Sequence, residues 1–135
     1  MTSSTTRILL VEDSKFLRLE MERVLSRDGY AVSTAADGEQ ALHMAQERPP
    51  DLILLDMLLP KISGPDVLKA LKHEILTADI PVVVLSGLSA RNSARLEADG
   101  AVRFLEKSSL ELDRGARPLL KALREIFSGI SSARE

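Results

Sequence analysis

The sequence predicts an α/β domain in which helices cover both faces of a parallel β-sheet. Three dense apolar blocks, at 7–11, 52–55 and 81–85, lack the polar alternation of a half-exposed strand, so they predict strands buried on both faces. Amphipathic stretches with helical spacing separate the blocks, and such alternation is typical of a doubly wound sheet. The chain of 135 residues is 44% hydrophobic, enough for the core of one domain.

Two weaker strand candidates, at 30–34 and 101–105, bring the predicted set to five strands and five helices. The first helix ends at Asp28-Gly29, and the second opens at Asp37-Gly38 and ends before Pro49-Pro50. Pro118 suits the first turn of the last helix. The apolar helix faces are, in chain order, Phe16, Leu17, Met21, Val24 and Leu25; Ala41, Leu42 and Ala45; Val67, Leu68 and Leu71; Ala94, Leu96 and Ala98; and Leu119, Leu120, Leu123, Ile126 and Phe127.

Charge and composition exclude several classes of function. Eighteen basic and twenty acidic residues give a net charge of -2, which argues against binding to nucleic acid or to an anionic membrane. The absence of cysteine excludes disulfides, thiolate metal sites and cysteine nucleophiles. The apolar run behind the polar N-terminus is too short for a signal peptide or a membrane span, so we expect a cytoplasmic protein.

We expect a single domain at residues 7–128, between a disordered N-terminus at 1–6 and a flexible tail at 129–135. This domain occupies nearly the whole chain, so no separate effector domain is expected. His43 and His73 stand on separate predicted helices without a second ligand at metal spacing, and we interpret both as surface residues.

Polar residues follow four of the five predicted strands. In an open parallel sheet, ligands bind at the carboxyl ends of the strands. Glu12 and Asp13 follow the first strand and Asp56 follows the third. Ser86 follows the fourth strand, and Lys107 comes shortly after the fifth. The topology therefore predicts that three carboxylates, a hydroxyl and an ammonium converge on one edge.

This set of groups matches phosphoryl transfer to a carboxylate. Three neighbouring carboxylates repel one another and need a cation, and Mg²⁺ prefers carboxylates, water and phosphoryl oxygens. A carboxylate beside that ion can act as the nucleophile on phosphorus and become an aspartyl phosphate. Lys107 and Ser86 would then supply a positive charge and a hydrogen-bond donor to the phosphoryl oxygens.

Four motifs in this order and spacing resemble the receiver domain of two-component response regulators. They are Val11-Glu12-Asp13-Ser14; Leu54-Leu55-Asp56-Met57-Leu58-Leu59-Pro60 with Gly64; Val84-Leu85-Ser86; and the run from Gly100 to Lys107. The resemblance extends from about Arg7 to Phe127. It implies a flavodoxin-like sheet of order 2-1-3-4-5 and a phosphorelay switch that is loaded by a histidine kinase or phosphotransfer protein and read by another protein.

The resemblance also implies a role for each matching residue. Asp56 would be the phosphoacceptor. Mg²⁺ would be bound by Asp13, Asp56 and the backbone carbonyl of Leu58, with Glu12 acting through a water. Lys107 would pair with Asp56 and then with the phosphoryl group, Ser86 would move toward that group, and Phe104 would be the aromatic switch. A homodimer could form through the fourth helix, fifth strand and fifth helix.

Three features depart from the family pattern. Ser108 stands where the family usually has a proline in a cis bond, and a non-proline cis bond costs about 3 kcal/mol or more, so we expect a trans bond or a more mobile loop. The segment 108–117 is longer than usual and could alter partner choice. Leu58 and Leu88 flank the acceptor site and cannot orient an attacking water, which predicts slow self-dephosphorylation.

Other interpretations are weaker. A degenerate receiver that binds partners without phosphate remains an alternative, because of Ser108 and because Phe104 could equally be a plain core aromatic. A haloacid-dehalogenase-like phosphatase would need an aspartate where Leu58 stands. A nucleotide-binding module would need glycines in the 11–15 loop. We therefore expect no enzyme activity beyond self-phosphorylation and slow self-dephosphorylation.

Overall fold

The computed structural model describes residues 5–87 and 97–134 and contains one sheet of five parallel strands. The spatial order is β2-β1-β3-β4-β5, which confirms the order that the family resemblance implies. The strands are β1 (Arg7–Val11), β2 (Ala31–Ala35), β3 (Leu52–Asp56), β4 (Val82–Ser86) and β5 (Arg103–Glu106). The helices are α1 (Lys15–Arg27), α2 (Gly38–Glu47), α3 (Gly64–His73) and α5 (Arg117–Arg134).

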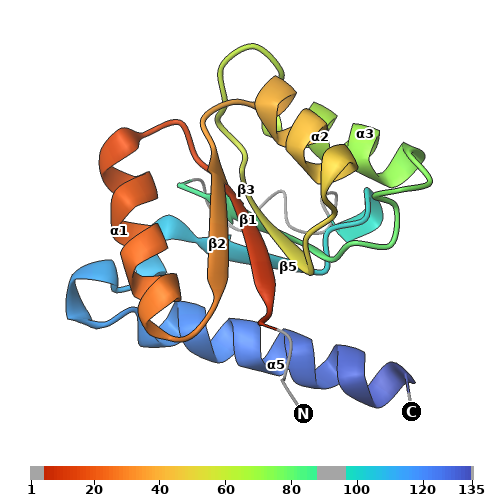
Figure 1. The fold of residues 1–135 in the computed structure, drawn as a ribbon. Coiled ribbons are helices and arrows are strands. Elements are labelled where there is room, and N and C mark those ends of the chain that lie inside the picture. The colour runs from red at the N-terminus through yellow and green to blue at the C-terminus, as the bar shows by residue number, and fades with distance from the viewer. Residues whose placement is uncertain (1–4, 88–96, 135) are drawn as a thin grey trace.

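The sheet separates two hydrophobic cores. Alternate residues of β1, such as Leu9 and Leu10, point to opposite faces, and both are buried. One core joins the sheet to α2 and α3 through residues that include Ala41 and Val67, and the other joins it to α1 and α5. Figure 1 shows these helix pairs on opposite sides of the strands. Burial on both faces explains why the central strands read as continuous apolar blocks.

Side-chain caps fix where the helices begin. Ser14 accepts a hydrogen bond from the Leu17 N–H at 3.3 Å, and Asp37 accepts one from the Gln40 N–H at 2.8 Å. Ser63 caps α3, whose first turn contains Pro65. Helix α1 gives way to Gly29 at a φ of 101°, a left-handed conformation that glycine adopts without strain. The helix boundaries predicted from Asp28-Gly29, Asp37-Gly38 and Pro49-Pro50 are confirmed.

Some boundaries differ from the sequence prediction. Strand β2 begins at Ala31, because the Tyr30 N–H donates to the Leu25 carbonyl of α1 at 3.2 Å and not to a neighbouring strand. The Tyr30 ring lies 5.8 Å from that of Phe127 on α5. Strand β5 begins at Arg103, two residues later than predicted. The helix predicted around Ala94, Leu96 and Ala98 lies mostly outside the described residues, which resume at 97.

The ends of the expected domain also differ in detail. Helix α5 continues to Arg134, so no helix end marks the boundary expected at residue 128. Residues 1–4 lie outside the described part of the chain. The Thr6 carbonyl, within the segment expected to be disordered, accepts a hydrogen bond from the Ala31 N–H at 2.9 Å. Among the described helices, none is both long enough and apolar enough to cross a membrane.

The segment between β5 and α5 forms two short 3-10 turns, at Lys107–Ser109 and Leu112–Arg114. No cis peptide bond occurs in the described residues, so the Lys107–Ser108 bond is trans. Glu111 and Ala116 have left-handed φ angles of 52° and 56°, which non-glycine residues seldom adopt. Buried Leu110 and Ala116 tie the segment to the core shared by α1 and α5.

Gly64 allows α3 to lie directly against the loop that follows β3. A Cβ atom built on Gly64 would collide with the Met57 Cα and lie 2.6 Å from the Asp56 carbonyl oxygen. Both contacts are with backbone, which cannot rotate away. A side chain at this position would therefore displace the loop that holds Asp56.

We expect Gly64→Ala to lower the free energy of unfolding by about 1–3 kcal/mol, the usual cost of overpacking. Gly129→Ala is the matched control, since its added Cβ meets nothing within 4 Å and it lies exposed on a helix. There alanine should raise stability by about 0.5–1 kcal/mol. Urea denaturation measures both, and equal stability of the two variants would contradict the close approach.

Candidate functional site

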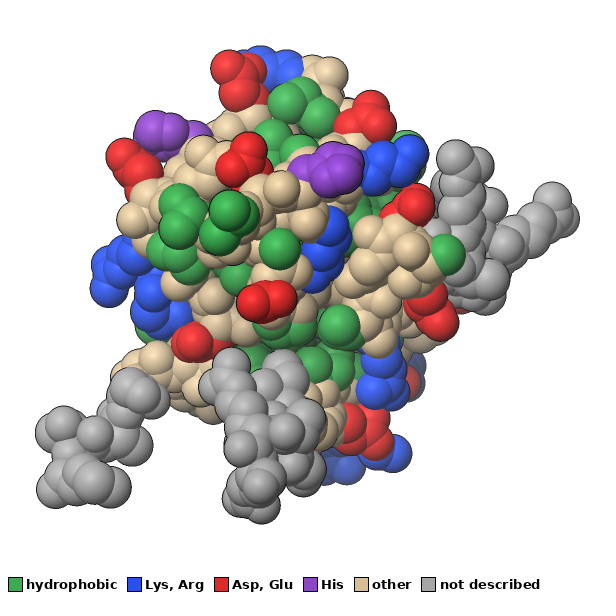
Figure 2. Space-filling model, turned by 90° about the vertical axis from the view of Figure 1, so that its right-hand side faces the viewer, with side chains coloured by type: hydrophobic (Ala, Val, Ile, Leu, Met, Phe, Trp, Pro, Cys, Tyr) green, Lys and Arg blue, Asp and Glu red, His purple; other side chains and the backbone are tan. Residues whose placement is uncertain are grey.

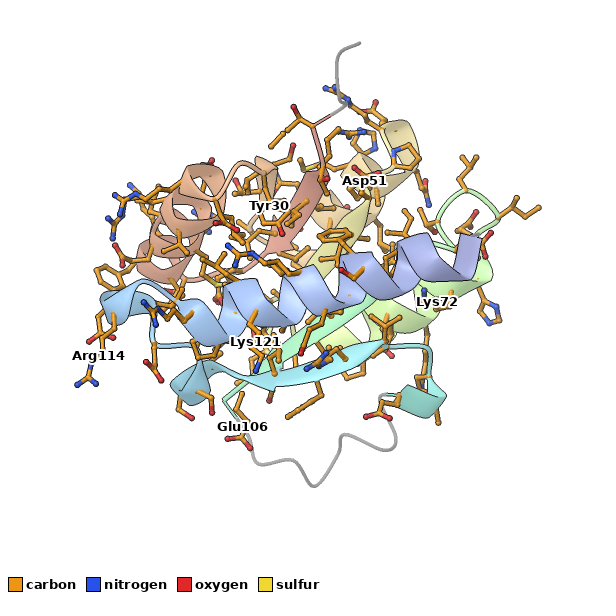
Figure 3. The ribbon with its side chains drawn as sticks, turned by 90° about the horizontal axis from the view of Figure 1, so that it is seen from below. Tyr30, Asp51, Lys72, Glu106, Arg114 and Lys121 are labelled. Carbon is orange, nitrogen blue, oxygen red and sulfur yellow. The ribbon has the colours of Figure 1, made fainter. Side chains whose placement is uncertain are left out.

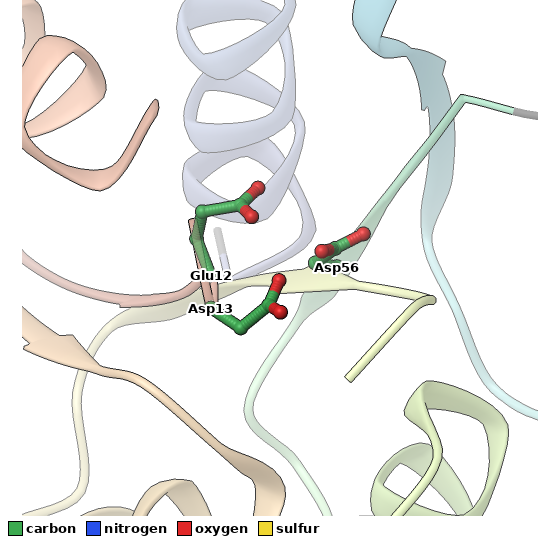
Figure 4. A group of neighbouring side chains, drawn as sticks. All are labelled: Glu12, Asp13 and Asp56. Carbon is green, nitrogen blue, oxygen red and sulfur yellow. The ribbon is translucent and has the colours of Figure 1, made fainter. Parts of the chain in front are cut away.

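The polar residues predicted from the strand ends meet at one edge of the sheet. Glu12 and Asp13 directly follow β1, while Asp56 and Ser86 are the last residues of β3 and β4. Lys107 follows β5. Glu12, Asp56 and Ser86 are almost fully buried. Figure 4 shows the three carboxylates side by side, and one oxygen from each lies within 4.8 Å of those of the others.

Lys107 bridges two of the carboxylates. Its Nζ lies 2.8 Å from Glu12 Oε1 and 3.1 Å from Asp56 Oδ2. The lysine side chain is about a quarter exposed, whereas the two carboxylates are almost completely buried. Lys107 thus reaches Asp56 although a trans bond to Ser108 follows it.

Burial and neighbouring charges shift the pKa values of Glu12 and Lys107 in opposite directions. Burial, supported by repulsion from Asp56, raises the pKa of Glu12 above its ordinary value near 4.5, although Lys107 and the Ser14 N–H favour the ionised form. Burial lowers the pKa of Lys107, but the carboxylates of Glu12 and Asp56 outweigh it, and the net effect raises that pKa. Lys107 therefore remains charged at neutral pH.

Backbone and side-chain contacts fix the loop that bears Glu12 and Asp13. The Ser14 N–H donates to Glu12 Oε2 at 3.1 Å, so both oxygens of this carboxylate are engaged. From α1, Arg18 donates to the Glu12 carbonyl at 2.8 Å and to the Asp13 carbonyl at 3.3 Å. Arg18 is not among the predicted site residues, because a side-chain contact to backbone carbonyls leaves no periodic signal in the sequence.

The donor set fits a small divalent cation. Three carboxylates face one ammonium, so ionised Glu12, Asp13 and Asp56 leave an excess of two negative charges. Asp13 is exposed and has no ion pair among the residues that the structure describes. Hard oxygen ligands of this kind, open to water on one side, are those that Mg²⁺ prefers.

The other predicted site residues lie at or near this edge. Leu58 is 64% exposed, and its N–H donates to Asp56 Oδ1 at 3.2 Å; metal binding by its carbonyl stays a prediction. Ser86 is buried at the end of β4, which pairs with the strand that bears Asp56. Phe104 is partly buried and packs against the core on the α2 and α3 side, which leaves its role as a switch untested. Leu88 lies outside the described residues.

A family model described as the response regulator receiver domain matches residues 8–114. The transcriptional regulatory protein PrrA of Mycobacterium leprae is 40% identical over 122 residues, which cover 89% of this chain and 50% of that protein. The phosphate regulon regulator PhoB of Klebsiella pneumoniae is 43% identical over 74% of this chain and 41% of its own length. The chain thus spans about half the length, or less, of these curated relatives.

Solved structures agree with the sequence comparison. The chemotaxis response regulator CheY4 of Vibrio cholerae superimposes with a TM-score of 0.81 at 29% identity, covering 91% of this chain and 99% of that one. The response regulator domain of Thermotoga maritima CheB gives a TM-score of 0.79 at 30% identity, covering 90% and 96%.

Removing the Lys107 ammonium should destabilise the fold in a pH-dependent manner. We expect Lys107→Met to lower the free energy of unfolding at pH 8 in EDTA by about 2–3 kcal/mol, less than for a fully buried pair because Lys107 is partly exposed. Glu12 has a raised pKa, so its ionised form costs stability at neutral pH and this cost disappears as the pH falls through that pKa. The loss should therefore shrink toward pH 5.

Urea denaturation at both pH values measures this effect. Lys121→Met, at an exposed lysine, is the matched control and should change stability by less than about 0.5 kcal/mol at either pH. An equal loss for Lys107→Met at pH 8 and pH 5 would show that the lysine does not compensate an ionised Glu12.

Proposed function

The chain belongs to the response regulator receiver family, and on that basis we propose that it is a phosphorylation-dependent signalling switch with Asp56 as the phosphoacceptor. The single observation that supports this role best is the position of Asp56: it is buried at the end of β3, its Oδ2 lies 3.1 Å from Lys107, and it lies beside two further carboxylates. Burial beside a fixed ammonium suits an oxygen that must accept a highly charged group.

The proposed reaction is transfer of a phosphoryl group from a phosphohistidine. An Asp56 carboxylate oxygen attacks phosphorus, so that an O–P bond forms. The bond between phosphorus and the imidazole nitrogen breaks, and the nitrogen keeps the electron pair. The Lys107 ammonium, already in contact with Asp56, would neutralise part of the added charge, and the Ser86 hydroxyl would donate to a phosphoryl oxygen.

Asp13, Asp56 and the Leu58 carbonyl would hold Mg²⁺, with Glu12 acting through a water. The bound ion would supply positive charge for the phosphoryl oxygens and orient them. Arg18 would keep the 12–13 backbone in place for this task, because it binds both carbonyls of the acidic pair.

The partners would be a histidine kinase or phosphotransfer protein that loads Asp56 and a protein that reads the altered surface. Relatives are named as transcriptional and chemotaxis regulators, so the output of this chain is not determined by its family. A homodimer through the β5 and α5 region is a further possible output. We propose no reaction on an external substrate beyond use of the phosphodonor.

Intact mass measurement after incubation with Mg²⁺ and a small phosphodonor tests the function. The wild type should gain one phosphoryl group, whereas Asp56→Asn should gain none, because an amide oxygen is a poor nucleophile. Asp13→Asn or added EDTA should strongly reduce the gain. Ser63→Ala, at a helix cap outside the acidic cluster, is the control and should be phosphorylated like the wild type.

A mass gain in Asp56→Asn would place the phosphoryl group elsewhere. If neither protein gains mass, the test is repeated with a phosphorylated phosphotransfer protein as donor. Failure with both donors would favour the alternative, a degenerate receiver that binds partners constitutively.

The phosphorylated protein should lose its phosphoryl group slowly, with a lifetime of minutes or longer. Leu58 lies beside the acceptor and cannot orient an attacking water by hydrogen bonding. Leu58→Asn should therefore shorten the lifetime, whereas Leu76→Asn, at a remote leucine of similar exposure (63%), should not. Decay of the phosphorylated mass measures this rate, and decay of the wild type within seconds would contradict the prediction.

A further inference from the structure

Strand β2 leaves one edge of the sheet open. It stands first in the spatial order, with α1 on one side and α2 on the other (Figure 1). The Ala31 N–H donates to the Thr6 carbonyl next to β1, and backbone groups alternate in direction along a strand, so Ser33 faces β1 as well. The N–H and C=O groups of Val32 and Thr34 therefore point away from β1, where the described part of the chain supplies no strand to pair with them.

Hydrogen bonds close both ends of this open edge. Before β2, the Tyr30 N–H donates to the Leu25 carbonyl of α1 at 3.2 Å. After β2, the Ala36 N–H donates to Gln40 Oε1 at 2.8 Å. The unpaired backbone groups thus lie at residues 32–34. Ser33, in the middle of this stretch, is exposed and small, so its side chain does not obstruct an approaching segment.

The β2 edge also lacks the features that usually keep edge strands from pairing. Natural edge strands are commonly blocked by charged side chains, prolines or bulges. Residues 30–36 contain no charged residue and no proline. The opposite edge strand, β5, begins with Arg103 and ends with Glu106, which is labelled in Figure 3. On the face in Figure 2, acidic and basic side chains lie among the hydrophobic ones, so the uncharged β2 edge is a local feature.

A cavity opens beside β2 on the face that α2 covers. Its volume is about 210 Å³, which is below the roughly 300–1,000 Å³ typical of small-molecule sites. Ser33 lines it together with four apolar residues, which are Ile8, Leu9, Met44 and Pro50. A cavity of this size and lining suits a single apolar side chain.

The charges around the cavity offset one another. The Arg7 guanidinium donates to the Pro49 and Arg48 carbonyls at 3.0 Å each, and the Arg7 N–H donates to Asp51 Oδ2 at 2.7 Å. Glu47 and Arg48 also line the cavity, so two basic side chains stand against two acidic ones in this region. An ionic ligand would gain little from such a balance, whereas an apolar side chain needs no net charge.

The cavity and the open edge are aligned through Ser33. In the sheet register Ser33 lies beside Leu9, and both residues line the cavity. Residues side by side on neighbouring strands point to the same face of a sheet. A segment added to β2 would therefore direct its residue beside Ser33 into the cavity. Main-chain pairing with a pocket for one side chain is the combination by which exposed sheet edges recognise extended peptides.

We propose that the β2 edge is a docking site for an extended segment of a partner protein, which pairs with Val32 and Thr34 and places an aliphatic side chain in the cavity beside Ser33. A second copy of this chain is less suitable. Two β2 strands paired about Ser33 would offer each cavity only a serine, which is too small to fill it. Asp56 and Lys107 take no part in this docking, so the inference stands or falls separately from the proposed function.

Backbone hydrogen exchange measured by NMR tests the docking on the unphosphorylated protein. The probe is a capped peptide in which threonines and valines flank a central leucine. It should slow exchange of the Val32 and Thr34 amides at least ten-fold, because these N–H groups become hydrogen-bonded. The same peptide with N-methyl groups on the residues that flank the leucine should leave the exchange unchanged, since it lacks the pairing donors.

Two substitutions test the role of the cavity. Glycine in place of the central leucine of the peptide should weaken binding at least ten-fold, a loss of about 1.4 kcal/mol. Ser33→Lys should also weaken binding at least ten-fold, because it puts a charged side chain at the cavity. Ser128→Lys adds the same charge at an exposed residue of α5 and is the matched control. It should bind the leucine peptide within two-fold of the wild type.

Slowed exchange with the leucine peptide, lost with the glycine and N-methylated peptides, supports the proposal. Unchanged exchange with the leucine peptide would overturn it. Equal binding of the leucine and glycine peptides, or equal loss in Ser33→Lys and Ser128→Lys, would also overturn it, since the cavity would then play no part. Slowing of the Val32 and Thr34 amides at raised protein concentration without peptide would overturn it as well, because a second copy would then be the occupant.

Discussion

The ionic contact of Lys107 with Glu12 and Asp56 is the interaction on which the site depends. Two nearly buried carboxylates lie in contact with this one ammonium, and a third, Asp13, lies beside them at the surface. Uncompensated charges of this kind cannot remain buried at neutral pH without either a counter-charge or a proton. The lysine lowers this cost but does not remove it, so the edge retains an affinity for further positive charge.

The fold produces this concentration of charge through topology. Glu12 and Asp13 follow β1 and Asp56 ends β3, and the residues before them, 8–11 and 52–55, are apolar and buried. Parallel pairing brings the carboxyl ends of β1 and β3 together. The close approach of Gly64 to the Asp56 carbonyl and to Met57 then fixes the position of the backbone that follows β3. The positions of the carboxylates at the sheet edge therefore depend on how the strands pair and on how α3 packs against the sheet.

Residues whose role follows from their place in a pattern were predictable from the sequence. The apolar blocks at 7–11, 52–55 and 81–85 predict β1, β3 and β4 to within one residue, and the polar residues at their ends predict which side chains meet at the sheet edge. The prediction was less accurate for β5. This edge strand pairs only with β4 and is only partly buried, so it lacks the continuous apolar run that marks the central strands.

Contacts between a side chain and distant carbonyls were not predicted at all. Arg18 binds the carbonyls of Glu12 and Asp13, and Lys72 binds those of Ala78 and Ile80. Such contacts satisfy backbone carbonyls that have no hydrogen-bond partner within the helices and strands, and neither residue type nor spacing predicts them. Lys107 contacts Glu12 and Asp56 although its bond to Ser108 is trans. The segment that continues from it is buried in the core at Leu110 and Ala116.

The division of the interior by the sheet has a thermodynamic consequence. Side chains on the α2 and α3 side and those on the α1 and α5 side share strands but belong to separate clusters. Truncations of apolar side chains taken from opposite clusters should therefore have additive free energies, whereas pairs taken within one cluster should interact. The domain therefore has two hydrophobic cores that share the strands of one sheet. A change of packing in one core should leave the packing of the other core unchanged.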